Sequence, residues 1–368
     1  MLGKKSDEYE GRLDDTFELN FNLNKNFIKL NLNKNFIKLI GLILILLFFF
    51  SYFNSFFGIF EKDTCGDETP YGKCSSILPY FCLKGTLVQD ASFCGCPDNI
   101  TIKGDFCEYE YQIAPKTISL DYVLNGKYEK IDFLVYKGME SYLEKKPQTF
   151  FYSNGKNYSL YDFKQRVINE QEQRKLLLPL VIEIQNIAKN KEDQARIAIS
   201  LVQNIPYEDN PVFDQRNPFL WNLKYPYDVL YQNEGLCGSK SDLLAFLLKE
   251  IGYEVVIFHY YLENHEAVGI RCPIKYSLNN MGYCFVEATQ PAIISYSEGD
   301  YSEQGKLTSV PEIIHISDGI SLGGILEEYN DAKDFGRIYR ASEKNDGNIN
   351  LMEYFRYKQL IKKYGLPN

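Results

Sequence analysis

Three side chains in the C-terminal half of the chain have the types needed for covalent catalysis: Cys237, His265 and Glu287. A cysteine nucleophile needs a base to take its proton, and usually a third group that orients the base. His265 lies in a polar turn that leads into a strand-like run at 263–270, and Glu287 lies in the next strand-like run, 282–291. The order thiol, imidazole, carboxylate predicts acyl transfer through a covalent intermediate.

The segment that must position the thiol is 233–251. Its apolar run from Leu243 to Leu248 covers every face at 3.6 residues per turn, which predicts a helix buried on all sides. Gly252 follows as a C-terminal stop. At the start of a helix, the unpaired N–H groups and the macrodipole favour a thiolate and could receive an oxyanion. We therefore expect Cys237 at the N-terminus of a buried helix.

These segments resemble the core of the transglutaminase-like superfamily, a papain-like cysteine fold. The matching motifs are Gly-x-Cys-Gly at Cys237, Asn-His-x-Ala-Val-Gly at His265 and Phe-Val-Glu-Ala-Thr at Glu287. The resemblance covers roughly residues 175 to 300. Within the superfamily, this sequence is similar to the prokaryotic, often archaeal, branch. It implies an α+β fold in which a helix bearing Cys packs on an antiparallel sheet bearing His and the acid. The third residue of the family is usually Asp, where this chain has Glu.

The resemblance implies a cysteine protease or amidase if water accepts the acyl group, and a transglutaminase if a lysine amine does. Hydrolysis is slightly favoured, because water is always available outside a cell. A non-catalytic surface protein that uses the fold as a binding scaffold is the alternative, since a fold does not guarantee activity. We expect a protein or peptide substrate, no cofactor and no metal. The net charge of −9 argues against a nucleic-acid partner.

The N-terminal region carries a membrane signal. Residues 1–38 are polar and contain a repeated nonapeptide at 22–30 and 31–39, which is either a spacer or a basic amphipathic segment for anionic lipid. Residues 39–60 lack charged side chains and are long enough to cross a hydrocarbon core of about 30 Å. Lysines precede this stretch and acidic residues follow it. The positive-inside rule therefore predicts a single-pass anchor, with a cytoplasmic N-terminus and residues 61–368 outside the cell membrane.

Six of the nine cysteines lie close together after the membrane segment. They are Cys65, Cys74, Cys82, Cys94, Cys96 and Cys107. So small a segment needs covalent cross-links in place of a large core, which predicts three disulfides in an extracytoplasmic module. A zinc site is the rival interpretation, but the segment lacks histidine and a Cys-x-x-Cys pair. The connectivity stays open.

The other three cysteines are Cys237, Cys272 and Cys284. If the last two pair, the unpaired thiol is the proposed nucleophile. In a regular antiparallel ladder, however, placing Cys272 opposite Cys284 moves Glu287 away from His265, and placing His265 opposite Glu287 separates the cysteines. A bulge or a diagonal contact would reconcile the two pairs. Otherwise we expect the triad, with two free and buried thiols.

The domain organisation follows from these signals. We expect a disulfide-rich module at 61–110, a β-rich subdomain at 111–165, a catalytic domain at 166–310 and a C-terminal extension at 311–368 that ends in a helix. The β-rich subdomain is predicted from a hairpin signal at Asn125-Gly126.

Three further expectations concern a helix cap, a loop and glycosylation. Asn190 is a plausible N-cap of a helix with an apolar stripe. The segment from Asn210 to Tyr231 is read as a loop rich in aromatic residues, which either lines the substrate cleft or only packs the loop down. Asn99 and Asn157 lie in glycosylation sequons.

Overall fold

The chain forms two compact units, Met1–Lys62 and Asp63–Asn368. The computed structural model describes residues 16–23, 26–33, 41–43, 45, 63–97, 100–146, 159–208, 224–302 and 305–367. The first unit contains an antiparallel hairpin of β1 (Thr16–Leu23) and β2 (Asn26–Asn33), which the polar composition of this tail did not predict. Most of the expected membrane segment, residues 39–60, lies outside the described residues. None of the helices described is long and apolar enough to cross a membrane.

The second unit begins with the disulfide-rich module. It consists of the hairpin β3 (Tyr80–Leu83) and β4 (Thr86–Gln89), the short helix α2 (Ala91–Cys94), and the hairpin β5 (Thr101–Lys103) and β6 (Phe106–Glu108). The disulfides are Cys65–Cys82, Cys74–Cys94 and Cys96–Cys107. The three predicted disulfides are therefore confirmed, and the connectivity that the sequence left open is defined.

The β-rich segment is one long hairpin of β7 (Pro115–Leu124) and β8 (Lys127–Tyr136), followed by α3 (Lys137–Leu143). Asn125 and Gly126 both have positive φ, 53° and 75°, as a tight two-residue hairpin turn requires, so the hairpin prediction is confirmed. The hairpin packs on the helices that follow it. The backbone N–H of Val123 donates to Ser200 Oγ at 2.8 Å, and buried side chains of both strands belong to the main core.

Five helices build most of the main core: α4 (Leu160–Ile168), α5 (Gln171–Ile187), α6 (Lys191–Asn204), α7 (Pro226–Gln232) and α8 (Cys237–Ile251). Asn190 caps α6 as predicted, because its side chain accepts from the N–H of Asp193 at 2.7 Å. The expectation of a loop up to Tyr231 is wrong over its last residues, where α7 forms. Tyr225 and Tyr227 are buried there and pack in the core, so they do not line an open cleft.

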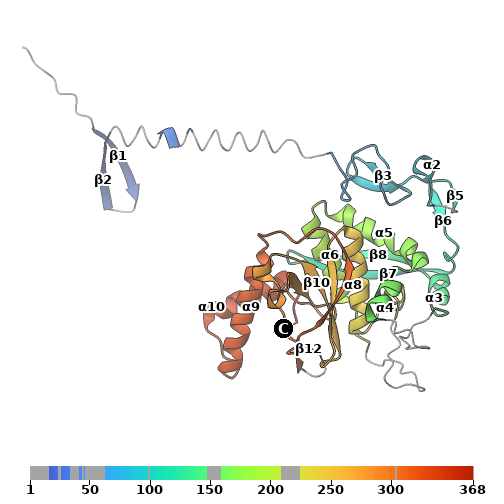
Figure 1. Cartoon of the computed structure of the whole chain (residues 1–368). Helices are drawn as coiled ribbons and strands as arrows, with labels where there is room; N and C mark the ends of the chain where they lie inside the picture. Colours follow the sequence, from blue (N-terminus) through green and yellow to red (C-terminus); the bar gives the residue numbers. More distant parts are fainter. Residues whose placement is uncertain are drawn as a thin grey trace, which may run out of the picture. The chain divides into compact units, whose positions relative to one another are not determined.

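The central sheet is antiparallel, with strand order β11-β10-β9-β14. Its strands are β9 (Val255–Tyr260), β10 (His265–Arg271), β11 (Tyr283–Val286) and β14 (Glu312–Ser317). Alternate residues of β9 belong to two different core clusters, because both faces of the sheet are covered. In Figure 1, α8 lies along the sheet. The mixed α+β class is confirmed.

The C-terminal part contributes to this sheet and its cover. β14 lies beyond residue 310, where we expected the catalytic domain to end, yet it pairs with β9. The helices α9 (Glu327–Lys344) and α10 (Leu351–Tyr364) follow, and the second confirms the predicted closing helix. Buried side chains of both helices pack with β9 in the second core cluster. The remaining short elements are η1 (Ile274–Tyr276), η2 (Leu278–Asn280), β12 (Asp300–Ser302) and β13 (Gly305–Lys306).

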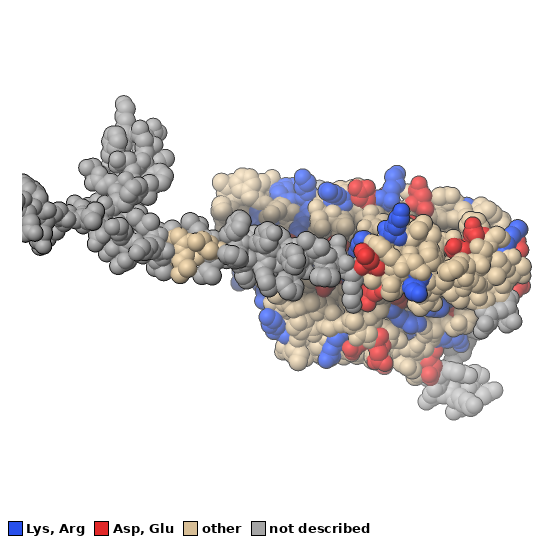
Figure 2. Space-filling model, turned by 90° about the horizontal axis from the view of Figure 1, so that it is seen from above, with Lys and Arg blue, Asp and Glu red and all other residues tan. Residues whose placement is uncertain are grey.

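Charged residues of both signs are scattered among uncharged residues on one face of the second unit. On the face drawn in Figure 2, Lys and Arg are interspersed with Asp and Glu. That face therefore presents no broad field of a single sign that would favour one kind of charged partner.

Candidate active site

Cys237 is the first residue of α8, as predicted. The helix is buried along nearly all of its length, and it ends at Gly252, whose φ of 112° is the left-handed conformation expected of a helix stop. Cys237 is half-buried and its thiol is free. Its Sγ lies 3.9 Å from the backbone oxygen of Asn264, the residue that precedes His265. The nucleophile candidate and the base candidate therefore lie side by side.

His265 begins β10, and Glu287 follows directly after β11. The ring nitrogen Nε2 of His265 lies 3.0 Å from Oε2 of Glu287. Both side chains are buried, with 3% and 1% of their surfaces exposed. Because Nε2 faces the carboxylate, Nδ1 is the ring nitrogen left for Cys237. The structure thus brings all three predicted residues together.

The electrostatics of His265 favour a charged ring. Burial lowers its pKa, but hydrogen bonds to Cys237 and Glu287, together with their charges, outweigh burial and raise the pKa to about 10. The raised pKa favours the charged imidazolium at neutral pH. A cationic ring beside a free thiol is the pairing that an activated cysteine nucleophile needs.

Glu287 is held by its own chain. Its Oε1 accepts from the N–H of Ala288 at 3.0 Å, from the N–H of Thr289 at 2.7 Å and from Thr289 Oγ1 at 2.6 Å. One carboxylate oxygen is thereby occupied by the turn, while the other faces the imidazole. This division fixes the direction from which Glu287 approaches His265. The longer side chain of Glu, compared with Asp, reaches the ring without loss of the contact.

Of the two outcomes that the sequence left open, the diagonal contact holds and the two free thiols do not, because Cys272 and Cys284 form a disulfide with a Cα–Cα distance of 5.7 Å. In the observed ladder Ile270 lies opposite Cys284, and the N–H of Cys272 donates to the backbone oxygen of Gly282 at 3.0 Å. The two cysteines are therefore diagonal neighbours, not directly opposite residues. Their Cα atoms are nevertheless close enough, because disulfides span Cα–Cα distances of about 4.4–6.8 Å.

The same register explains why the disulfide and the triad coexist. Val268 lies opposite Val286, so one further step along the ladder brings Glu287 level with Ala267. His265 is two residues from Ala267, so His265 and Glu287 are diagonal neighbours as well. The observed register lies midway between the two that the sequence offered. The Cys272–Cys284 pair and the His265–Glu287 pair are each two residues from a directly opposite position, so both contacts form in the same ladder.

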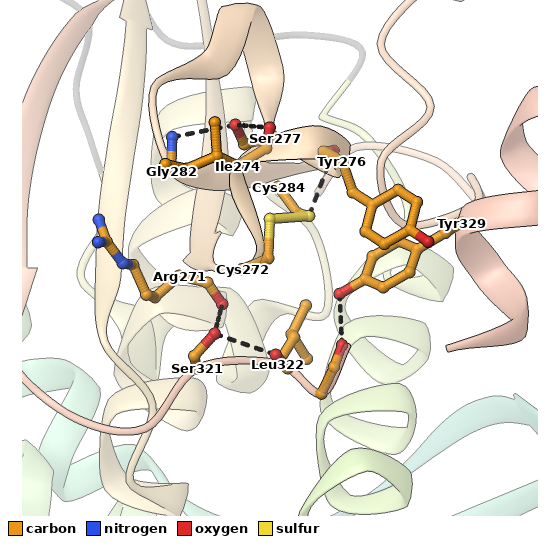
Figure 3. The surroundings of a disulfide bond; sticks show 11 residues. Arg271, Cys272, Ile274, Tyr276, Ser277, Gly282, Cys284, Ser321, Leu322 and Tyr329 are labelled. Atoms are coloured by element: carbon orange, nitrogen blue, oxygen red, sulfur yellow. Dashed lines mark hydrogen bonds between the residues drawn. A yellow bond between two sulfur atoms is a disulfide. The ribbon is translucent and has the colours of Figure 1, made fainter. Parts of the chain in front are cut away.

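Figure 3 shows what surrounds the Cys272–Cys284 disulfide. Tyr276 and Tyr329 stack beside it with ring centroids 3.9 Å apart, and the Tyr329 hydroxyl donates to the backbone oxygen of Gly323 at 2.9 Å. Tyr329 belongs to α9, so the C-terminal helices pack against the end of the strand that carries His265. The disulfide is buried under this contact.

The structure also reveals polar residues near the site that sequence reasoning missed. Lys240 is fully buried on the first turn of α8, and its Nζ donates to backbone oxygens, including that of Thr289 at 2.8 Å. Gln203 donates to the backbone oxygen of Glu287 at 2.9 Å. A lysine in a helix that is apolar on every face is the signal that could have identified the first of them, because such a cation needs buried partners.

A second cluster of buried polar side chains joins four elements: α4, α8, β9 and β10. Lys164 of α4 is fully buried and donates to Asp242 of α8 at 2.9 Å and to Glu266 of β10 at 2.5 Å. His259 Nδ1 lies 3.0 Å from the other oxygen of Glu266. Because Glu266 follows His265 directly, this cluster ties the strand that carries the base to the helix that carries the thiol.

Several expectations fall outside the described residues. They include the sequon residues Asn99 and Asn157 and most of the aromatic loop, residues 209–223. Within the ranges that are described, no three His, Cys, Asp or Glu side chains are grouped so that they could hold a metal ion.

Comparisons with known proteins give little likeness. No family model matches the sequence, and no curated protein does. Among solved structures, a protein from Parabacteroides distasonis described as a candidate protease matches with a TM-score of 0.28 and 11% sequence identity. The match covers 57% of this chain and 41% of that one. The chain thus spans less than half the length of that protein, and the chemistry of the site has to be argued from its own geometry.

Proposed function

We propose that this chain is a transglutaminase-like cysteine enzyme that acts on peptide or glutamine amide carbonyls through an acyl-enzyme. The observation that carries the proposal is the buried imidazole of His265, whose Nε2 lies 3.0 Å from Glu287 and whose pKa is raised by Glu287 and by the free thiol of Cys237. A helix bearing the thiol beside an antiparallel sheet bearing the base and acid supports the papain-like arrangement. The catalytic roles are thiolate nucleophile, general acid and base, and orienting carboxylate.

The reaction follows from these positions. The Cys237 thiolate attacks the carbonyl carbon of an amide, and the carbonyl oxygen becomes an oxyanion. Backbone N–H groups at the start of α8 have no helical acceptor and can stabilise that charge. As the intermediate collapses, the C–N bond breaks and the leaving amine takes the His265 proton. A thioester remains on Cys237.

The second half returns the enzyme to its resting state. His265, now neutral, takes a proton from water, and the oxygen attacks the thioester carbonyl. The C–S bond breaks, the acid is released, and His265 again faces a thiolate. An amine in place of water gives transfer instead. Hydrolysis is favoured because water needs no binding site of its own.

The proposal includes a place in the cell. We propose a single-pass membrane anchor at residues 39–60 and an extracytoplasmic enzyme. Four disulfides support this placement, because disulfides persist in oxidising compartments and are rare in the cytosol. In the sequence, the module of residues 63–108 follows the proposed anchor and precedes the catalytic part.

The deciding experiment is alkylation of the full-length protein with iodoacetamide at neutral pH, followed by mass mapping. Because eight cysteines are disulfide-bonded, Cys237 is the thiol expected to react. We expect fast labelling that is absent in Cys237→Ala and at least about tenfold slower in His265→Ala, since a lost imidazolium partner costs more than about 1.4 kcal/mol. If Cys237 is labelled at the same rate in His265→Ala as in the wild type, the result favours a non-catalytic binding scaffold.

The acyl acceptor is decided by a second measurement on an active preparation. A glutamine peptide is incubated with and without a primary amine, and its mass is followed. Deamidation or cleavage supports hydrolysis, whereas an amine adduct formed in preference to both supports transfer. Cys237→Ala is the control in either case.

A further inference from the structure

Lys240 is a buried cation close to the triad that the mechanism above does not use. It follows Cys237 by three residues on α8, and none of its side chain is exposed. Its Nζ donates to the backbone oxygen of Ile205, at the end of α6, and to that of Thr289 at 2.8 Å. The backbone oxygen of Gln203 lies 3.5 Å away. One ammonium group thus connects the nucleophile's helix with two other segments.

The contact with Thr289 is the important one, because Thr289 holds the acid. Its N–H and its Oγ1 donate to Glu287 Oε1 at 2.7 and 2.6 Å, while its backbone oxygen accepts from Lys240. Glu287 Oε2 in turn contacts His265, which hydrogen-bonds Cys237. The chain of contacts therefore forms a closed ring. It starts at Cys237, passes through Lys240 of the same helix and the Glu287–Thr289 turn, and returns through His265.

This placement is electrostatically unfavourable for a lysine. The N-terminus of a helix repels a cation, and burial away from water disfavours the charged form. Burial lowers the Lys240 pKa to about 8, although the charge of Glu287 opposes the change. A side chain kept in such a place needs a compensating role. Its carbonyl partners, drawn from two segments outside α8, indicate that this role is to join those segments to the helix.

We propose that Lys240 is a positioning residue that holds the Glu287–Thr289 turn under His265 from the helix that carries the nucleophile. Gln203 assists it, because its amide donates to the backbone oxygens of Glu287 at 2.9 Å and Ala292 at 3.2 Å. This inference rests on the proposed function, since it assigns a role in aligning that triad. The hydrogen bonds of Lys240 Nζ go to backbone oxygens, so Lys240 acts through Thr289 and not on the reacting atoms themselves.

The test is the titration of His265 by NMR in the full-length protein with isotope-labelled histidine. The chain has three histidines, so each signal can be assigned by substitution. In the wild type we expect a midpoint near the His265 pKa of about 10. In Lys240→Met the turn loses its anchor and Glu287 withdraws, so the midpoint falls toward the ordinary value of about 6.5. Lys240, whose pKa is about 8, has already lost its proton near pH 10, so loss of its charge leaves the midpoint unchanged or raises it. Only displacement of the turn lowers the midpoint.

Lys191→Met is the matched control. Lys191 also donates to a backbone oxygen of α8, that of Ile251 at 2.9 Å, but at the opposite end of the helix, and burial lowers its pKa too. We expect it to lower the melting temperature without moving the His265 midpoint. Alkylation of Cys237 should slow about tenfold in Lys240→Met, equivalent to about 1.4 kcal/mol, and stay unchanged in Lys191→Met.

A midpoint that stays constant or rises in folded Lys240→Met overturns the proposal. If that variant does not fold, Gln203→Leu replaces it, and a fall of the midpoint in the same direction supports the network, whereas no change overturns it. The proposed function fails separately, when His265→Ala does not slow alkylation of Cys237. The NMR result is a separate readout, because it measures the pKa of His265 and not the reactivity of Cys237.

Discussion

The disulfide-rich module and the region around α8 are held together by different interactions. In the module, residues 63–108, the strands are three or four residues long, and its buried cluster is small and includes Ile182 of α5. Three disulfides supply the stability that so small a core does not provide. Around α8 the helix is almost wholly buried, and buried ion pairs and carbonyl contacts hold the segments together. A site that needs aligned side chains is found in the second kind of region.

The comparison shows which kind of interaction fixes the positions of side chains. A disulfide joins two backbone points but leaves the side chains between them unspecified. A buried polar group, by contrast, is costly unless each partner is in place, so it selects one arrangement. The Cys272–Cys284 disulfide belongs to the α8 region and fits this view, because it lies beyond the triad and leaves the His265–Glu287 contact to hydrogen bonds.

The largest effect is expected from breaking the buried cluster behind the site. Lys164→Met leaves Asp242 and Glu266 buried without their cation, which costs about 3–5 kcal/mol of unfolding free energy. Urea denaturation of both proteins measures the difference. The control is Lys103→Met in the module, where the ion pair with Glu108 is exposed and little change is expected. Equal losses in the two variants would contradict the contrast between the regions.

A smaller effect is expected from removing one cross-link of the module. Replacing Cys65 and Cys82 together with Ser costs about 3 kcal/mol, because the bond closes a loop of 17 residues. We expect faster amide hydrogen exchange within residues 63–108 and unchanged protection of α8. Protection lost equally in α8 would show that the two regions fold as one cooperative unit.

The smallest effect concerns pH. The His265 pKa is about 10 in the folded protein and about 6.5 in an unfolded chain, so the folded state binds the proton more tightly. Its stabilising contribution is complete below about 6.5 and is lost as the pH rises toward 10, by about 1.4 kcal/mol per unit between the two values. The measurement is the unfolding free energy of wild type minus His265→Gln from pH 6.5 to 7.5, below the Lys240 pKa of about 8.

That difference should shrink as the pH rises. A difference that grows or stays constant would mean that the imidazole is neutral in the folded protein. The module lacks histidine, so its exchange behaviour over the same range serves as an internal reference.

The sequence by itself determined the local features. The apolar run after Cys237 predicted α8 and its stop at Gly252, and Asn125-Gly126 predicted the hairpin of β7 and β8. The odd number of cysteines, with six in one short segment, predicted the disulfide module and an unpaired thiol. Each of these depends on neighbours along the chain, which periodicity, turn chemistry and counting can detect.

Only the tertiary structure decided how the parts of the site meet. The register of β10 and β11 lies between the two registers that the sequence allowed, and it permits the disulfide and the His265–Glu287 contact together. The ties from Lys240 to Thr289 and from Lys164 to Glu266 join segments far apart in sequence. Their partners are backbone carbonyls and buried carboxylates, whose positions depend on how the helices and the sheet pack. No local pattern records that packing.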